Sequence, residues 1–466
     1  MMRVLDLSAP APLFTGRPIA PASARLAPSP PGDPLIGHQR MARDPLTSFL
    51  KLREAHGDVV RLQFGTLTAH LVSDPSLVQA VLQDRARIYG KQTRGMKQLR
   101  LALGEGLLTS EGDFWLRQRR IAQPAFHRKR IDALTPAMIE AGERARATFV
   151  PGRVFDLHEA MMRLTLDVVA TTLLGSGIAE REARVVGAAV DFITAESNRR
   201  LRNPFQLPLS VPTPQNRTFL RHRANLDAIV FRMIEQRRRS GVMGDDLLSL
   251  LLHATDPETG EHMSDAQLRD EVMTIFLAGH ETTANALSWA FVQLSRHPAV
   301  AQRLKQELDT VLAGRSPTLE DLPALVYTRQ VLDEVMRLYP PAWTIARSPT
   351  EDDELGGYFI PRGSLVFVSP WVVQRHPALF PNPEGFDPER FAPGTKLAHR
   401  FAYFPFGGGP RLCIGRTFAL VEATLLLATL AQHHRFDLVP GFPVVPESAV
   451  TLRPAGGLSM IAIPYD

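Results

Sequence analysis

The chain has 466 residues, of which 44% are apolar and 22% charged, the composition of an ordinary soluble globular protein. Length alone would suggest about three domains, but no repeat or low-complexity break divides the chain, so we expect one large, helix-rich domain. The formal net charge is +5, yet lysine and arginine are dispersed among 48 acidic residues in no recognisable nucleic-acid-binding module, which argues against a nucleic-acid partner.

The N-terminal segment is rich in proline and alanine. It lacks the basic-then-apolar order of a signal peptide, and no run of about 18 apolar residues follows, so we expect a cytoplasmic protein without a membrane anchor. Residues 1–27 are expected to form a poorly ordered extension. The prolines from Pro18 to Pro34 predict an extended arm that packs against the first helix.

The next elements form the start of a small sheet. Apolar and polar residues alternate over Asp58–Phe64, and Thr68–Val72 follows across Gly65, which predicts a β-hairpin. After a helix over Pro75–Leu82, the glycine-containing stretch Tyr89–Thr109 predicts a long loop of the kind that closes over a binding site.

A helix that opens at Trp115 places Trp115 and Arg119 on one face, because the two residues are four positions apart. Two interpretations of this pair are open. On its own it is a buried tryptophan beside solvated arginines on a surface helix; a second interpretation depends on the family resemblance described below.

A long apolar helix is predicted from the capping box Ser264–Gln267 to about His297. The six residues 278–283, Ala-Gly-His-Glu-Thr-Thr, break the local rules, because glycine and adjacent β-branched residues are unfavourable inside a helix. We therefore expect a widened turn, a usual place for function. A zinc motif is excluded because Ala284 occupies the position of the second histidine.

The pair Glu334 and Arg337 lies on a predicted helix that ends at Tyr339. At a spacing of three, such a pair is usually a surface salt bridge of small value. The apolar neighbours of these two residues instead predict that the pair is buried, and a buried pair needs further partners to offset desolvation.

The segment 406–415 reads Phe-Gly-Gly-Gly-Pro-Arg-Leu-Cys-Ile-Gly and contains Cys413, the only cysteine of the chain. Most lone cysteines are small buried hydrophobic residues. Here, however, an apolar helical run begins just after Cys413, and a helix N-terminus favours a metal-binding thiolate. Gly409 and Gly415 would allow the backbone to approach a flat ligand, with Arg411 as a cation for it and Phe406 as a shield.

Taken in order, these motifs resemble the cytochrome P450 family from about residue 28 to the end of the chain. The resemblance implies a mainly α fold, a helical prism with a small β-rich lobe, in which residues 28–466 form a single catalytic domain. It also implies a haem b cofactor with Cys413 as the axial iron ligand. The other cofactor-binding residues it implies are Trp115, Arg119, Ala278, Arg347, Phe406, Gly409, Arg411 and Gly415.

The implied reaction is the insertion of one oxygen atom from O2 into an apolar substrate. Glu281 and Thr282 would be the acid and alcohol that route protons, and Glu334, Arg337 and Arg390 would be a structural triad behind the cysteine loop. Parts of the chain resemble the branch that acts on fatty acids and related lipids, and terpenoids or steroids are further candidates. The alternatives are a peroxygenase driven by H2O2 and a non-enzymatic haem sensor.

Electron supply is expected from a separate protein, since about 50 residues follow Cys413 and cannot form a flavin or iron–sulfur domain. The resemblance implies a ferredoxin, or a flavodoxin, with its NAD(P)H reductase, and a monomeric enzyme. Basic residues near the Trp115 helix would steer such an acidic partner. These residues are Arg117, Arg120, Arg128, Lys129 and Arg130.

Overall fold

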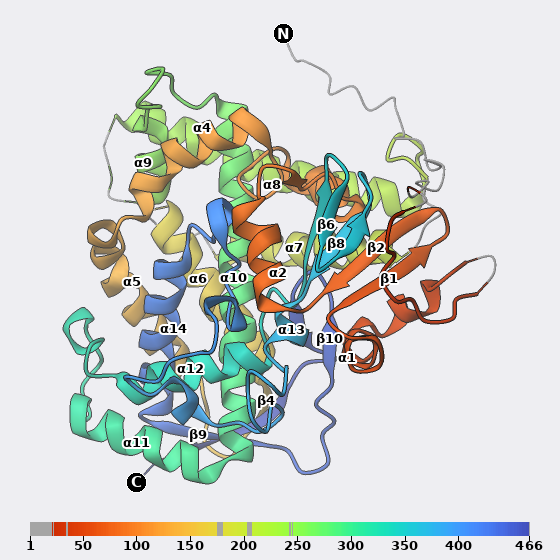
Figure 1. Ribbon diagram of the computed structural model, residues 1–466. Coiled ribbons are helices and arrows are strands. Elements are labelled where there is room, and N and C mark those ends of the chain that lie inside the picture. The colour runs from red at the N-terminus through yellow and green to blue at the C-terminus, as the bar shows by residue number, and fades with distance from the viewer. Residues whose placement is uncertain are drawn as a thin grey trace.

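The computed structural model describes residues 21–465 except 22, 34–35, 175–179, 203–206, 242–243 and 245. Figure 1 shows a helical body with a smaller sheet lobe on one side, and the long helix α10 (Asp265–Arg296) runs through the body. The mainly α fold with a small β-rich lobe is therefore confirmed. Among the helices of the described chain, none combines the length and the apolar character needed to cross a membrane.

The other α-helices are α1 Pro45–His56, α2 Pro75–Gln79, α3 Arg94–Leu103, α4 Gly112–Ala122, α5 Arg128–Arg146, α6 Leu157–Leu174, α7 Glu180–Arg202, α8 Pro214–Ser240, α9 Leu247–His253, α11 Pro298–Leu312, α12 Val326–Leu338, α13 Pro370–Val373 and α14 Arg416–Ala431. A π-helical turn, η2 (Ala80–Asp84), continues α2. The 3-10 turns are η1 Gln39–Arg43, η3 Gln123–Phe126, η4 Leu319–Asp321, η5 Pro388–Phe391, η6 Arg400–Ala402 and η7 Gly409–Arg411.

The sheet lobe is a five-stranded sheet of order β1-β2-β8-β5-β3 within the described residues. Its strands are β1 Val59–Phe64, β2 Leu67–Val72, β3 Tyr89–Gly90, β5 Ile345–Pro349 and β8 Leu365–Val368. Smaller sheets pair β4 (Val154–Asp156) and β9 (His434–Leu438) with β12 (Ser459–Pro464), β6 (Asp353–Leu355) with β7 (Tyr358–Ile360), and β10 (Pro446–Ser448) with β11 (Leu452–Pro454). The predicted hairpin is confirmed, with β1 and β2 antiparallel and Phe64 opposite Leu67.

Helix α10 is the centre of the helical core. Its side chains are buried around the whole circumference over most of its length, as expected for a helix enclosed by other helices. The helices α5, α6, α12 and α14 contribute to the same apolar cluster. Trp289 of α10 is fully buried and stacks on Tyr339, with ring centres 4.2 Å apart. The predicted capping box is present, because the Ser264 and Gln267 side chains each accept a hydrogen bond from the other's backbone N–H.

The widened turn expected in the middle of α10 is absent, because Asp265–Arg296 is α-helical throughout. The unusual residues have other physical reasons. A Cβ on Gly279 would come within 3.1 Å of Val169 on α6, so the glycine permits close helix packing. The Thr282 hydroxyl donates to the Ala278 carbonyl at 2.7 Å without interrupting the helix.

The long loop expected over Tyr89–Thr109 is wrong for residues 94–103, which form α3. The Thr93 hydroxyl caps this helix by accepting from the Met96 N–H at 3.3 Å, and Leu99 and Leu103 are buried one turn apart. Gly104 ends the helix with φ +70°, so it is a terminator and not a loop marker. The loop prediction holds for residues 91–93 and for the stretch that follows α3.

The expectation for the N-terminal extension lies mostly outside the described residues. Arg25, at the end of that segment, is fixed on the β6–β7 hairpin: its carbonyl accepts from the Phe359 N–H at 2.9 Å, and its guanidinium lies over the Tyr358 ring.

Candidate active site

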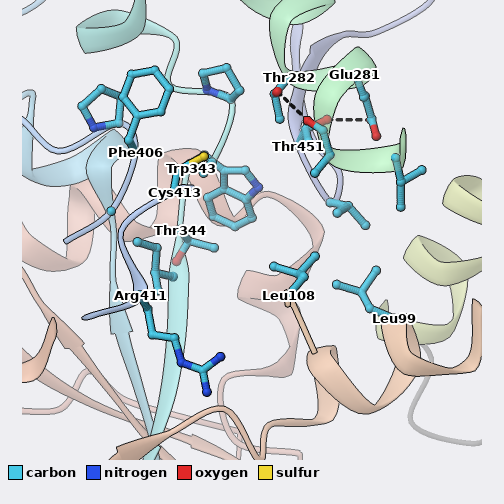
Figure 2. Close-up of a pocket in the computed structure, with 18 of the residues that line it drawn as sticks. Leu99, Leu108, Glu281, Thr282, Trp343, Thr344, Phe406, Arg411, Cys413 and Thr451 are labelled. Carbon is cyan, nitrogen blue, oxygen red and sulfur yellow. Dashed lines mark hydrogen bonds between the residues drawn. The ribbon is translucent and has the colours of Figure 1, made fainter. Parts of the chain in front are cut away.

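A cavity of about 750 Å³ lies between the centre of α10, the cysteine loop and the edge of the sheet lobe. Figure 2 shows Cys413 and Phe406 on one side and Glu281, Thr282 and Thr451 on the other, with apolar side chains between them. The structure thus brings Cys413 to the same cavity as Glu281, a residue 132 positions before it (413 − 281).

The cysteine loop is held in one conformation by its own backbone and by its glycines. The Cys413 N–H donates to the Phe406 carbonyl at 3.1 Å, which closes the loop. Gly409 has φ +64°, and a Cβ there would collide with the Leu82 carbonyl. This glycine is therefore required by its packing against η2. A Cβ on Gly415 would lie 4.0 Å from the Cys413 sulfur.

Cys413 lines the cavity, and its exposed surface faces this interior space. Removal from bulk water raises the pKa of the Cys413 thiol above its usual value. A hydrogen bond from the Gly415 backbone and the charges of Arg119 and Arg416 lower this pKa, but by less. The sequence predicts that the helix N-terminus favours a thiolate, but in the protein without a metal this effect does not outweigh the effect of burial. A coordinated metal ion would be the group that removes the proton.

Four cationic side chains converge on the cavity beside the cysteine loop: Lys91, Arg119, Arg347 and Arg411. Each is held by a backbone carbonyl. Lys91 donates to Leu108 at 2.8 Å, Arg119 to Leu412 at 2.9 Å, Arg347 to Ala346 at 3.2 Å and Arg411 to Ser110 at 2.9 Å. The Arg411 guanidinium also lies 3.7 Å from the centre of the Trp115 ring.

Burial lowers the pKa values of these cations, and for Arg411 and Lys91 the neighbouring positive charges lower them further. Burial lowers the pKa of Arg411 to about 10, with Arg347 and Arg119 adding to the shift, and burial lowers the pKa of Arg347 to about 10 as well. Burial lowers the pKa of Lys91 well below its usual value, helped by Arg347 and Arg411. Glu111 is the acidic group that opposes these shifts. A flat ligand with two carboxylates next to a sulfur-bound metal fits this donor set, so the haem implied by the sequence is compatible with the site.

The opposite wall is formed by α10. Ala278 and Thr282 line the cavity one turn apart, and Thr282 is partly accessible. Glu281 is 4% exposed, and its carboxylate accepts a hydrogen bond from the Thr451 hydroxyl at 2.6 Å. The predicted acid and alcohol therefore both face the cavity, and the acid is also tied to the β10–β11 turn (Figure 2).

The rest of the cavity surface is mainly apolar, so it suits a substrate with little polar surface. The apolar lining residues include Leu99, Leu107, Leu108, Val169, Ile275, Leu277, Trp343 and Val450.

The loop that carries Leu107 and Leu108 is pinned to α10 by two adjacent carboxyl groups. Asp270 accepts from the Glu105 N–H at 2.8 Å, and Glu271 accepts from the Leu107 N–H at 3.0 Å. Burial raises the pKa of Glu271 to about 8, with the charge of Asp270 adding to the shift. The loop prediction for this stretch thus gains a structural basis that the sequence did not reveal.

Behind the cysteine loop, the structure places Glu334 and Arg337 in the core. Arg337 also donates to the carbonyls of Gln374, Pro383 and Gly385 at 2.7–2.9 Å. Arg390 comes within 3.4 Å of the Glu334 carboxylate. The three residues of the expected triad are therefore together, and the interpretation as a surface salt bridge is wrong.

The basic surface expected near the Trp115 helix is partly neutralised. Arg117 forms an ion pair with Glu261, and Arg120 lies 3.0 Å from both Asp256 and Glu258. These acidic residues come from the turn before α10, which the sequence alone did not place beside α4. Arg117 and Arg120 are therefore not the free charges that the docking argument required.

Sequence reasoning did not find Lys91, Glu111 or Thr451 as site residues. Lys91 and Glu111 are isolated in sequence, and no motif or periodicity distinguishes them. Thr451 hydrogen-bonds a residue 170 positions away, so only tertiary packing reveals it.

Comparisons with known proteins agree with this geometry. A family model described as Cytochrome P450 matches residues 28–459. Cyclooctatin synthase of Streptomyces melanosporofaciens is 41% identical over 440 residues, which cover 94% of this chain and 95% of the relative. Cyclooctat-9-en-7-ol 5-monooxygenase of the same organism is 40% identical over 434 residues, 91% of this chain and 94% of the relative. Pentalenene oxygenase of Streptomyces avermitilis is 36% identical over 429 residues, again 91% and 94%.

A solved structure is similar over almost its whole length. The crystal structure of the cytochrome P450DA heme domain superimposes with a TM-score of 0.86 and 28% sequence identity, covering 95% of this chain and 98% of that chain.

Proposed function

From the premise that this chain belongs to the cytochrome P450 family and is a monooxygenase, we propose that it inserts one oxygen atom from O2 into a C–H bond of a cyclic terpenoid. The observation that carries the proposal is the mainly apolar cavity with the Cys413 sulfur on one wall and Glu281 and Thr282 on the other. Such a cavity can hold an apolar skeleton between a metal site and a proton source.

Haem b would lie against the cysteine loop, with Cys413 as the iron ligand. Arg119, Arg347, Arg411 and Lys91 would hold its two carboxylates, and Trp115 lies against the Arg411 guanidinium. Phe406 would shield the sulfur, and Ala278 would face the cofactor from α10. When bound, the haem supplies an iron whose thiolate ligand donates electron density and favours cleavage of the O–O bond.

Glu281 and Thr282 would supply protons to the oxygen site. The Thr282 hydroxyl is anchored on the Ala278 carbonyl and partly accessible, so it can order water there. The nearly buried Glu281 carboxyl is the nearby group that can exchange protons. Glu334, Arg337 and Arg390 would act only structurally, by holding the chain behind the cysteine loop.

The substrate class rests on the cavity and on the relatives. Relatives that are 36–41% identical are named for cyclooctatin, cyclooctat-9-en-7-ol and pentalenene. These names favour a terpenoid over the fatty acids and steroids that the sequence also allowed. Electrons would come from a ferredoxin with its NAD(P)H reductase, or from a flavodoxin, to an enzyme that works as a monomer in the cytoplasm.

The test is a screen of the haem-loaded protein. Cyclic terpene hydrocarbons, their alcohols, fatty acids and steroids would be tested for the haem spin-state shift and then for turnover with a surrogate ferredoxin, its reductase and NADH under 18O2. We expect a terpenoid to give the largest shift and a product that contains one 18O atom.

Other results would identify the alternatives. Product formed with H2O2 but not with O2 and NADH would indicate a peroxygenase. Haem binding with no turnover of any compound would indicate a sensor or binding protein. A larger shift and turnover with fatty acids would keep the monooxygenase and overturn the terpenoid assignment.

A further inference from the structure

A hydrogen-bonded chain of three side chains connects α10 to the β10–β11 turn. The Thr451 hydroxyl lies 2.6 Å from the Glu281 carboxylate and 3.0 Å from the Asn285 amide nitrogen. All three side chains are nearly or fully buried, at 4%, 0% and 7% exposure for Glu281, Asn285 and Thr451. Glu281 and Asn285 are four positions apart, so they lie on one face of α10 and converge on the same hydroxyl.

The chain has a defined direction. A hydroxyl has a single hydrogen, and a carboxylate can only accept, so the Thr451 hydrogen is committed to Glu281. Asn285 must then donate its N–H to the Thr451 oxygen, which prevents the hydroxyl from turning away. The buried side-chain oxygen of Asn285 has no hydrogen-bond partner among the described residues, which is unfavourable. The side-chain amide therefore keeps an orientation in which only its N–H group is used, in the bond to Thr451.

The turn that carries Thr451 is itself fixed. Trp289, four positions after Asn285, donates its indole N–H to the Leu452 carbonyl at 3.3 Å, and Trp343 donates to the Ala449 carbonyl at 3.0 Å. The Leu452 N–H donates to the Pro341 carbonyl at 2.9 Å. These hydrogen bonds fix the backbone around Thr451, so its hydroxyl is held in one position relative to the Glu281 carboxyl.

The same turn forms part of the cavity wall, through Val450 and Thr451 (Figure 2). Asn285 does not line the cavity and is completely buried. Thr451 can therefore contact a substrate, but Asn285 cannot. Variants of the two residues can distinguish an effect on substrate binding from an effect on the Glu281 carboxyl.

We propose that Thr451 and Asn285 are positioning residues, which hold the Glu281 carboxyl in one orientation beside Thr282 and so keep proton delivery coupled to product formation. This inference rests on the proposed function, because it assumes that Glu281 supplies protons. Thr451 and Asn285 do not touch the reacting atoms. They act only through Glu281.

The test uses the haem-loaded protein, the terpenoid that it oxidises in the screen above, and the ratio of H2O2 to product. Thr451→Val keeps the side-chain shape and removes the hydroxyl, and the loss of one hydrogen bond to a carboxylate should raise this ratio about tenfold. Thr451→Ser keeps the hydroxyl and should remain within about twofold of wild type. Asn285→Leu should raise the ratio while the substrate dissociation constant from the spin-state titration stays unchanged.

A second measurement does not depend on turnover. Melting temperatures of wild type, Glu281→Met, Thr451→Val and the double variant form a cycle, and we expect the double variant to lose clearly less than the sum of the single losses. Additive losses would mean that the two side chains do not interact, and would overturn the proposal. Equal ratios of H2O2 to product in Thr451→Val and Thr451→Ser would overturn it as well.

Proton delivery by Glu281 and the positioning of Glu281 by Thr451 can be tested separately. In the Glu281→Met background, Thr451→Val should leave the ratio of H2O2 to product unchanged, and a further rise would show that Thr451 acts without Glu281. A wild-type ratio in Glu281→Met alone would instead refute proton delivery by Glu281, and this proposal with it, while the monooxygenase activity itself would stand.

Discussion

Arg337 donates two hydrogen bonds to the Glu334 carboxylate, at 2.7 and 2.8 Å, and neither side chain has any solvent exposure. The Glu334 carboxylate also accepts from the Asp387 N–H at 2.9 Å, which connects the helix α12 to the chain before η5. Removal of either partner would leave an uncompensated charge in the core, and such a loss costs about 3–5 kcal/mol.

We therefore expect Glu334→Ala to fold poorly and to bind little haem, as measured by melting temperature and by haem content after purification. The matched control is Glu389→Ala, which removes the partner of Arg303 at the surface, where a pair is worth about 0–1 kcal/mol. Normal haem content in Glu334→Ala would show that the triad is not needed for assembly of the site.

Cys413→Ser should abolish the thiolate spectrum of the reduced carbon monoxide complex, because the electronic effect of the ligand comes from an anionic sulfur. The protein should still fold, since the sulfur lies at the cavity and is not packed in the core. The measurement is the absorption spectrum of the reduced protein with CO. An unchanged spectrum would mean that another residue binds the iron.

Thr282→Ala should keep the fold and the haem but divert reducing equivalents to H2O2, because it removes the cavity-lining hydroxyl that we propose orders water for proton delivery. Product per NADH should fall several-fold, whereas Thr282→Ser should stay close to wild type. Equal coupling in Thr282→Ala and wild type would remove Thr282 from proton delivery.

Glu271 predicts a pH-dependent stability. Its pKa is raised from the ordinary 4.5 of a glutamate to about 8 in the folded protein, so between these pH values the unfolded chain releases a proton that the folded chain keeps. The contribution of Glu271 to the free energy of unfolding is therefore fully present below pH 4.5. It decreases by roughly 1.4 kcal/mol per pH unit as the pH rises toward 8. Glu271→Gln should remove this contribution, seen as the difference between the melting curves of the two proteins from pH 5 to pH 9.

Glu422 provides the comparison for this titration, because burial also raises its pKa to about 8 while Thr283 donates to its carboxyl at 3.0 Å. Glu422→Gln should give a difference of the same sign over the same pH range, although it lies on α14 and not beside the loop. A flat difference for Glu271→Gln would show that Glu271 is ionised when folded.

Redox-partner docking is expected at the start of α5 and not at Arg117. Arg128 is 64% exposed although it lies 3.2 Å from Asp132 of its own helix, and Lys129 is exposed, whereas Arg117 and Arg120 pair with the acidic turn before α10. Arg128→Glu combined with Lys129→Glu should slow reduction by a ferredoxin and weaken its salt dependence, because screening acts within about 8–10 Å. Arg117→Gln is the control and should reduce at the wild-type rate; equal rates in both variants would place the docking site elsewhere.

The sequence identified those parts of the site that lie within one local segment. The cysteine loop, the capping box of α10, the pair Glu281 and Thr282, and the pair Glu334 and Arg337 each form a recognisable pattern, and the structure brings them together around one cavity and its support. Local pattern failed where glycine was ambiguous, because Gly104 can mark a loop or end a helix, and α3 was missed for that reason.

Long-range contacts explain the other omissions. Thr451 acquires its role from α10, and Arg117 loses its free charge to Glu261, a residue 144 positions away. Neither contact follows from periodicity, since both depend on how separate segments pack.

The anchoring of the loop after α3 also has a consequence for how this chain can change its substrate range. Asp270 and Glu271 of α10 hold the backbone N–H groups of Glu105 and Leu107, and the Thr109 and Ser110 hydroxyls donate to loop carbonyls, so none of these hydrogen bonds uses the side chain of Leu107 or Leu108. The side chains of Leu107 and Leu108, which face the cavity, can therefore be exchanged while the backbone beneath them stays in place. Mutation at these two positions can therefore reshape the pocket while the hydrogen bonds between the loop and α10 stay intact, so this wall can acquire new specificities without the loop being rebuilt.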